Sequence, residues 1–128
     1  MQGFAVGAIY VGGALHLAFV VFHLMFSRLF NWREELAPLS PLNRGVVPVL
    51  NLSLVVAFLG AAYLSFTFAA ELVATAVGRG VCFALAVFWL ARLAQQFIFF
   101  GLRKPMSWVL SLAFLVLGAI YALPLFPG

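Results

Sequence analysis

Four long apolar stretches dominate the sequence, and they restrict the fold more than any other feature. They cover roughly residues 4–26, 46–70, 81–101 and 108–125. Each is close to the length of about 20 residues that a helix needs to cross the hydrocarbon core of a bilayer. Strands of a membrane barrel would alternate in polarity over about 10 residues, whereas these stretches are continuously apolar. The sequence therefore predicts an all-α integral membrane protein with four transmembrane helices.

The composition and the connections agree with this fold class. Of the 128 residues, 66% are hydrophobic and 8% are charged, whereas soluble domains are about 25% charged. The segments between the apolar stretches are short and contain proline and glycine, which favour turns. They leave no room for a separate soluble domain. We therefore predict that residues 1–128 form a single transmembrane domain, an up-down four-helix bundle.

The basic residues predict how the chain is oriented. Five of them lie in the first and third connections, and the second connection holds only Arg79. The five are Arg28, Arg33, Arg44, Arg103 and Lys104. Basic connections stay in the cytoplasm, so both termini are expected on the non-cytoplasmic side of a multi-pass protein of the bacterial inner membrane. This placement accounts for the positive charge without a nucleic-acid partner. Trp32, Trp108 and Tyr121, close to the ends of the stretches, are expected to be interfacial anchors.

Local signals suggest where helices begin and where they approach each other. Asn43 precedes the second stretch and is a candidate N-cap. Pro48 is then expected in the first helical turn, where proline is tolerated. Gly3 and Gly7 have the small-xxx-small spacing of closely packed membrane helices.

Six strongly polar residues, each a histidine, an arginine or a side-chain amide, interrupt the apolar stretches, and their depths suggest one cluster. They are His16, His23, Asn51, Arg92, Gln95 and Gln96. With a helical rise of about 1.5 Å per residue, four of them fall at similar depth in the cytoplasmic half, and His16 and Arg92 lie nearer the middle. We expect this cluster to contact a partner, a lipid or a ligand.

Arg92 is the most informative member of the predicted cluster. A charge at the centre of a membrane helix costs about 2.5–3.5 kcal/mol on insertion scales. The only acidic residues, Glu34, Glu35 and Glu71, lie outside the apolar stretches. Arg92 must therefore bind backbone carbonyls and the nearby glutamines, a bound anion, or a carboxylate on another chain.

The two histidines raise the question of a cofactor. His16 and His23 share one helix face but are separated by roughly 10 Å along it, so they cannot both bind one metal through bonds of about 2 Å. Cys82 lies at a different depth again. We predict no metal site within the chain. Haem b, with His16 or His23 as ligand, would need a second chain or one-sided coordination. A quinone pocket, or hydrogen bonds across helices with no cofactor, are the other possibilities.

No catalytic residues are predicted. The chain has no aspartate, a single cysteine, and no serine with an evident base and orienting acid. The leading hypothesis is a small non-catalytic inner-membrane subunit or accessory protein of a larger assembly, surrounded by lipid and by other membrane subunits or copies of itself. A redox subunit that binds haem b or quinone is one alternative. A small oligomeric transporter or channel for an anion or a neutral solute is the other.

Overall fold

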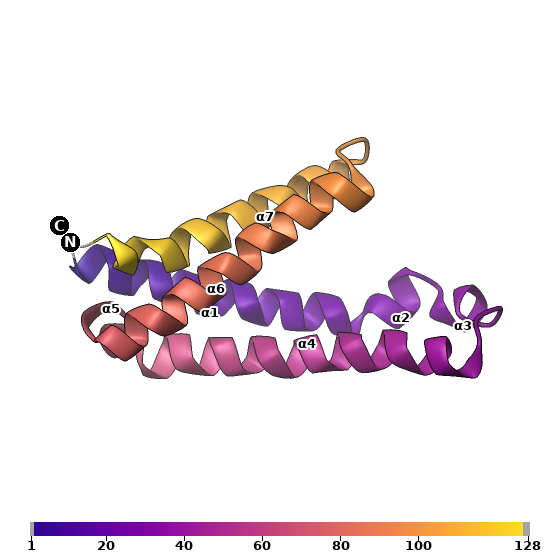
Figure 1. The fold of residues 1–128 in the computed structure, drawn as a ribbon, viewed down its shortest axis with the longest axis horizontal. Helices are drawn as coiled ribbons and strands as arrows, with labels where there is room; N and C mark the ends of the chain where they lie inside the picture. The colour runs from indigo at the N-terminus through magenta and orange to yellow at the C-terminus, as the bar shows by residue number, and fades with distance from the viewer. Residues whose placement is uncertain (1, 127–128) are drawn as a thin grey trace.

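The computed structural model describes residues 2–126, which are mostly helical with no strand in that range (Figure 1). Four helical segments are long and apolar enough to cross a membrane: Gln2–Leu24, Pro41–Thr67, Ala76–Phe100 and Pro105–Leu125. The chain thus has the structure of a multi-pass membrane protein. The elements are α1 (Gln2–Leu24), α2 (Phe26–Leu29), α3 (Trp32–Glu35), α4 (Pro41–Thr67), α5 (Ala69–Ala74), α6 (Ala76–Gln95), the π-helical η1 (Gln96–Phe100), α7 (Pro105–Ala122) and the 3₁₀-helical η2 (Leu123–Leu125).

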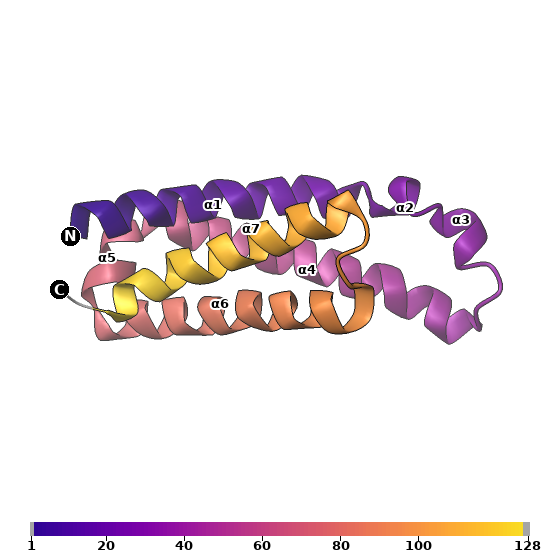
Figure 2. The ribbon, with the colours of Figure 1, turned by 90° about the horizontal axis from the view of Figure 1, so that it is seen from above.

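The long helices form two pairs that meet at one end and diverge at the other. α1 packs beside α4, and α6 packs beside α7 (Figures 1 and 2). The two pairs are in contact at what we call the closed end, where α5 and both ends of the described chain lie. They separate towards the open end, which holds α2, α3 and the connection from α6 to α7 (Figure 1).

The start of α4 differs from the sequence-based expectation. The Ser40 hydroxyl accepts a hydrogen bond from the Asn43 backbone N–H at 3.3 Å, and Pro41 occupies the first helical turn. Serine is a strong N-cap and proline suits the first turn, so the helix begins at Pro41 and Ser40 is its cap. The prediction of Asn43 as the N-cap was wrong, and Pro48 lies inside the helix and not in its first turn.

A tight junction joins α5 to α6 at the closed end. The Thr75 hydroxyl accepts the Gly78 backbone N–H at 2.9 Å and donates to the Glu71 carbonyl at 2.8 Å. A Cβ atom at Gly78 would collide with the backbone of Glu71 and Leu72. Only glycine allows α6 to begin this close to α5.

The small-xxx-small pair does not mediate close packing within the chain. A Cβ atom at Gly3 or Gly7 would have no neighbour within 4 Å. The close approach within α1 occurs instead at Gly12, where a Cβ atom would lie 2.6 Å from the Tyr121 hydroxyl oxygen of α7.

A layer of aromatic side chains, one from each long helix, fills the centre of the molecule. Its members are Phe19, Phe58, Trp89 and Phe114, all buried. Trp89 stacks on Phe58 with ring centroids 5.2 Å apart and on Phe114 at 5.7 Å, and Phe19 stacks on Phe114 at 5.7 Å. Aromatic pairs of this kind contribute about 0.5–1.5 kcal/mol beyond the area they bury. The aromatic layer therefore holds the two helix pairs together.

Candidate functional site

His16 is completely buried beside the aromatic layer, and both of its ring nitrogens are engaged. Nε2 lies 3.1 Å from the indole Nε1 of Trp89, and Nδ1 lies 2.8 Å from the carbonyl oxygen of Gly12. An indole N–H can only donate, so Nε2 is the acceptor. The proton is therefore on Nδ1, which donates to the Gly12 carbonyl.

The hydrogen bonds of His16 extend to the other two long helices. The Tyr121 hydroxyl is 3.3 Å from Nδ1 of His16, and the Ser65 hydroxyl is 2.6 Å from the Tyr121 hydroxyl. Because Nδ1 donates, the Tyr121 oxygen accepts from it, and the Tyr121 O–H is free to donate to Ser65. We call Ser65, Trp89, Tyr121 and His16 the His16 network. It contains one side chain from each of α4, α6, α7 and α1.

A second pair of hydrogen bonds joins the end of α1 to α4. The Asn51 amide nitrogen donates to the His23 backbone carbonyl at 2.8 Å, and the Asn51 amide oxygen lies 2.8 Å from Nδ1 of His23. A backbone carbonyl can only accept, which fixes the orientation of the amide. Nδ1 of His23 must therefore carry a proton and donate it to the amide oxygen. We call this pair the His23–Asn51 lock.

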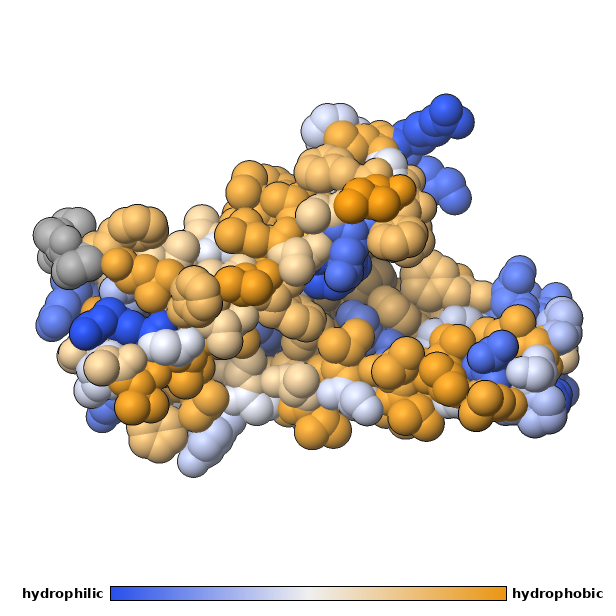
Figure 3. Space-filling view, in the orientation of Figure 1, coloured by the Kyte–Doolittle hydropathy of each residue, from blue (hydrophilic) through white to orange (hydrophobic). Residues whose placement is uncertain are grey.

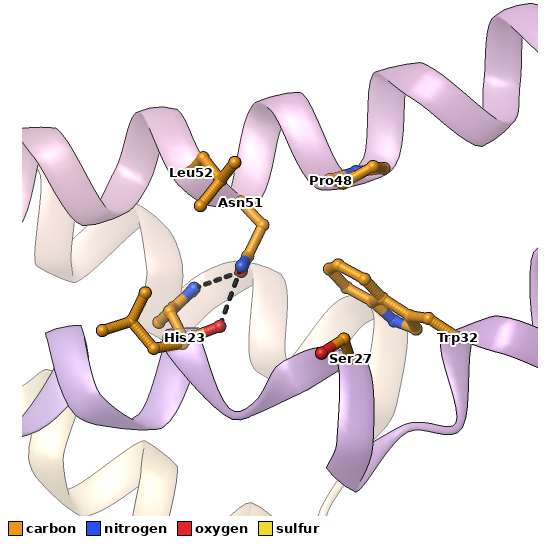
Figure 4. Close-up of a pocket in the computed structure, with 7 residues that line it drawn as sticks. His23, Ser27, Trp32, Pro48, Asn51 and Leu52 are labelled. Atoms are coloured by element: carbon orange, nitrogen blue, oxygen red, sulfur yellow. Dashed lines mark hydrogen bonds between the residues drawn. The ribbon is translucent and has the colours of Figure 1, made fainter.

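A cavity of about 210 Å³ adjoins the His23–Asn51 lock at the open end. It is lined by His23, Leu24, Ser27, Trp32, Pro48, Asn51 and Leu52. In Figure 4 the Trp32 ring extends towards Pro48 and Asn51, and the Ser27 hydroxyl points towards His23. The cavity thus has a flat aromatic wall on one side and polar groups on the other.

Arg92 lies half-buried in the second half of α6, the half that runs towards the open end (Figure 1). Its guanidinium donates to the Gln95 amide oxygen at 3.3 Å and lies 4.6 Å from the ring centroid of Phe114. The space-filling view shows a notch between the helix pairs, with hydrophilic atoms on its α6 wall (Figure 3). In this half of α6 the strongly hydrophilic residues are Arg92 and Gln95, and Gln96 follows at the start of η1. We call this feature the Arg92 notch.

The six polar residues predicted to cluster are distributed over separate places. His23 and Asn51 form the lock, and Arg92 and Gln95 form another hydrogen-bonded pair. His16 belongs to a network deeper in the molecule, and Gln96 is buried on its own at the start of η1. Similar depth in the membrane was therefore a guide to some contacts but did not bring all six together.

Sequence reasoning missed most of the His16 network. Tyr121 was expected at the membrane interface because it is near the end of the last apolar stretch. The structure corrects this, since Tyr121 is fully buried and hydrogen-bonded. Gly12, four residues before His16, could have been found from helical spacing, which places its carbonyl near the histidine ring. Nothing in the sequence pairs Ser65 with Tyr121.

The described residues contain no group of three or more histidine, cysteine, aspartate or glutamate side chains that could hold a metal ion. Cys82 is fully buried, and its thiol faces the Leu72 carbonyl with a sulfur–oxygen distance of 3.8 Å. It packs as a small core residue.

Fold and site together define a small multi-pass membrane protein with a buried polar network. Comparisons with protein-family models, with curated proteins and with solved structures found no match. A functional assignment therefore depends on the chain's own residues.

Proposed function

We propose that this chain is a non-catalytic subunit or accessory protein of a larger membrane assembly, and that the Arg92 notch receives a carboxylate from a membrane-spanning helix of a partner subunit. The helices would cross the bacterial inner membrane up-down-up-down, with the open end in the cytoplasmic half and both termini on the other side. The distribution of basic residues supports this orientation, because four of the five in the first and third connections lie beyond the spanning helices at that end.

Arg92 is the observation on which the proposal rests. Its contacts within the chain are a neutral amide and an aromatic face. Neither partner carries a negative charge, so the guanidinium lacks the counter-charge that charged side chains in mid-membrane usually have. The three acidic residues lie at the ends of the long helices or in their connections. An anion from outside the chain would neutralise the positive charge of Arg92.

Depth favours a protein partner over a lipid phosphate. Arg92 is eight residues before Phe100, the end of the spanning segment, which corresponds to about 12 Å along the helix. A lipid phosphate lies at the membrane surface, whereas an acidic residue on a neighbouring helix can be placed at any depth. A carboxylate paired with arginine can also accept two parallel hydrogen bonds.

The haem and transporter alternatives receive less support. Both nitrogens of His16 are already hydrogen-bonded, so only Nε2 of His23 is left for an axial ligand. For transport, the buried aromatic layer and His16 network occupy the centre of the described part of the chain, where a solute would have to pass. The quinone alternative is separate, because it concerns the cavity beside His23.

The experiment compares charge-removing and charge-keeping variants in the native membrane. Wild type, Arg92→Gln and Arg92→Lys are purified in mild detergent, and the masses of intact complexes are measured. We expect Arg92→Gln to lose the partner subunit and Arg92→Lys to retain it at least partly. Arg79→Gln, on the opposite side, is the matched control. A wild-type protein that carries only anionic lipid, or a complex unchanged by Arg92→Gln, would contradict the proposal.

A further inference from the structure

The cavity beside the His23–Asn51 lock is lined by His23, whose Nε2 has no hydrogen-bond partner among the described residues. Nδ1 of His23 donates to the Asn51 amide oxygen. In the neutral imidazole the other nitrogen, Nε2, is then an acceptor. A ligand that satisfies it must therefore bring a hydrogen-bond donor.

The other walls of the cavity define the rest of the ligand. The Ser27 hydroxyl, which points towards His23, can donate to a ligand oxygen (Figure 4). The Trp32 ring and Pro48 provide flat apolar surface. One hydroxyl group could thus donate to His23 and accept from Ser27, while the ring that bears it lies against Trp32.

Two apolar residues of the cavity wall are also exposed on the surface of the molecule. Leu24 and Leu52 line the cavity and are 57% and 54% exposed. Because both are on spanning helices, a ligand would enter from the bilayer, and any part too large for the cavity would lie along these apolar side chains. This favours an amphiphile with a small polar ring and an apolar tail.

The volume fits a single substituted ring. The cavity measures about 210 Å³, and an apolar cavity of about 150 Å³ is enough to hold benzene. A macrocyclic ring system would exceed this volume.

We propose that this cavity binds the hydroxylated ring of a membrane-soluble hydroquinone, with its apolar tail directed past Leu24 and Leu52 into the lipid. The ring hydroxyl donates to Nε2 of His23. This site is separate from the Arg92 notch, so the inference goes beyond the proposed function and is tested by a different readout.

The geometry predicts selectivity for the reduced, hydroxyl-bearing form. A ring whose hydroxyls are methylated has the same shape but cannot donate to Nε2. Leaving that acceptor unpaired, with the loss of one hydrogen bond, weakens binding by about tenfold.

The test uses the full chain in lipid nanodiscs, titrated without oxygen with a short-chain ubiquinol and with its dimethyl ether. Quenching of tryptophan fluorescence reports binding, and Trp32→Phe identifies the part of the signal that comes from the cavity. We expect saturable quenching by ubiquinol, about tenfold weaker binding of the dimethyl ether, and loss of the saturable signal in Trp32→Phe.

Variants of Leu52 in the cavity wall and of His23, the proposed hydrogen-bond acceptor, complete the test. Leu52→Phe should obstruct the cavity and weaken binding without adding a tryptophan to the fluorescence signal. Leu59→Phe, on the same helix, exposed and outside the cavity, should bind like wild type. His23→Ala should remove the preference for ubiquinol over its ether. Equal affinity of wild type for the two compounds, or unchanged binding by Leu52→Phe, would overturn the proposal. Since Leu52 is more than half exposed, its variant tests the site even if His23→Ala fails to fold.

Discussion

The indole N–H of Trp89 on α6 donates to Nε2 of His16 on α1 across 3.1 Å, in a part of the molecule where both side chains are almost fully buried. These two residues connect the two helix pairs. Nδ1 of His16 also lies within hydrogen-bond distance of the Gly12 carbonyl and of the Tyr121 hydroxyl. The His16 network therefore holds the two helix pairs together inside the molecule, and the pairs separate towards the open end.

Removing the indole donor should destabilise the protein. In Trp89→Phe, Nε2 of His16 keeps its burial and loses its partner, so we expect the free energy of unfolding to fall by about 1–3 kcal/mol. Denaturation in mixed micelles measures it. Trp108→Phe, at an exposed position, is the control and should change stability little. Equal effects of the two variants would argue against the bond.

The hydrogen bond between Ser65 and Tyr121 can be measured with a double-mutant cycle. Ser65→Ala, Tyr121→Phe and the double variant should give a coupling energy of about 0.6–1.7 kcal/mol, the range found for hydrogen bonds between membrane helices. Thermal or denaturant unfolding measures how much each of the three variants changes the free energy of unfolding relative to wild type. Additive effects of the two substitutions would mean that the hydroxyls do not interact.

Gly12 should tolerate no side chain. In Gly12→Ala the new Cβ atom would lie 2.6 Å from the Tyr121 hydroxyl oxygen, and overpacking of this kind costs about 1–3 kcal/mol. Gly7→Ala is the matched control on the same helix, because its Cβ atom has no neighbour within 4 Å. Alanine is the better helix former, so this control should be neutral or stabilising by up to about 1 kcal/mol. The opposite order would contradict the described packing.

The proposed orientation predicts which positions react from each side of the membrane. Cys82 is buried and should not react with an impermeant maleimide. In intact cells, Val77→Cys at the closed end should be labelled, because this position is 80% exposed. Leu42→Cys at the open end, 75% exposed, should be labelled only after the cytoplasmic face is made accessible. The reverse labelling pattern would show that the chain has the opposite orientation in the membrane.

The helical class of this protein could be predicted from sequence because continuous apolar stretches of this length leave few alternatives to membrane-spanning helices. Helix ends were less predictable. The Ser40–Pro41 cap extends α4 beyond the apolar stretch, and α5 breaks away from it at Phe68. Hydropathy does not register either feature, since caps and breaks depend on individual hydrogen bonds.

The candidate site was predicted only in part. Depth placed His23 beside Asn51, because residues at equal depth on packed helices are near one another. Arg92 and Gln95 are three residues apart on one helix, and that spacing alone brings their side chains together. The His16 network depends on how each helix is rotated about its axis. That rotation is set by packing of Phe19, Phe58, Trp89 and Phe114, and no pattern in one sequence specifies it.

The proposed role as a subunit depends on what occupies the Arg92 notch, and cross-linking can identify this occupant. A photo-crosslinking amino acid placed at Gln95, which is exposed and hydrogen-bonded to Arg92, is activated in native membranes, and the adduct is analysed by mass spectrometry. We predict a cross-link to the membrane-spanning segment of another protein, near an acidic residue, that disappears when Arg92→Gln is added. Adducts with lipid alone would contradict the proposed role as a subunit.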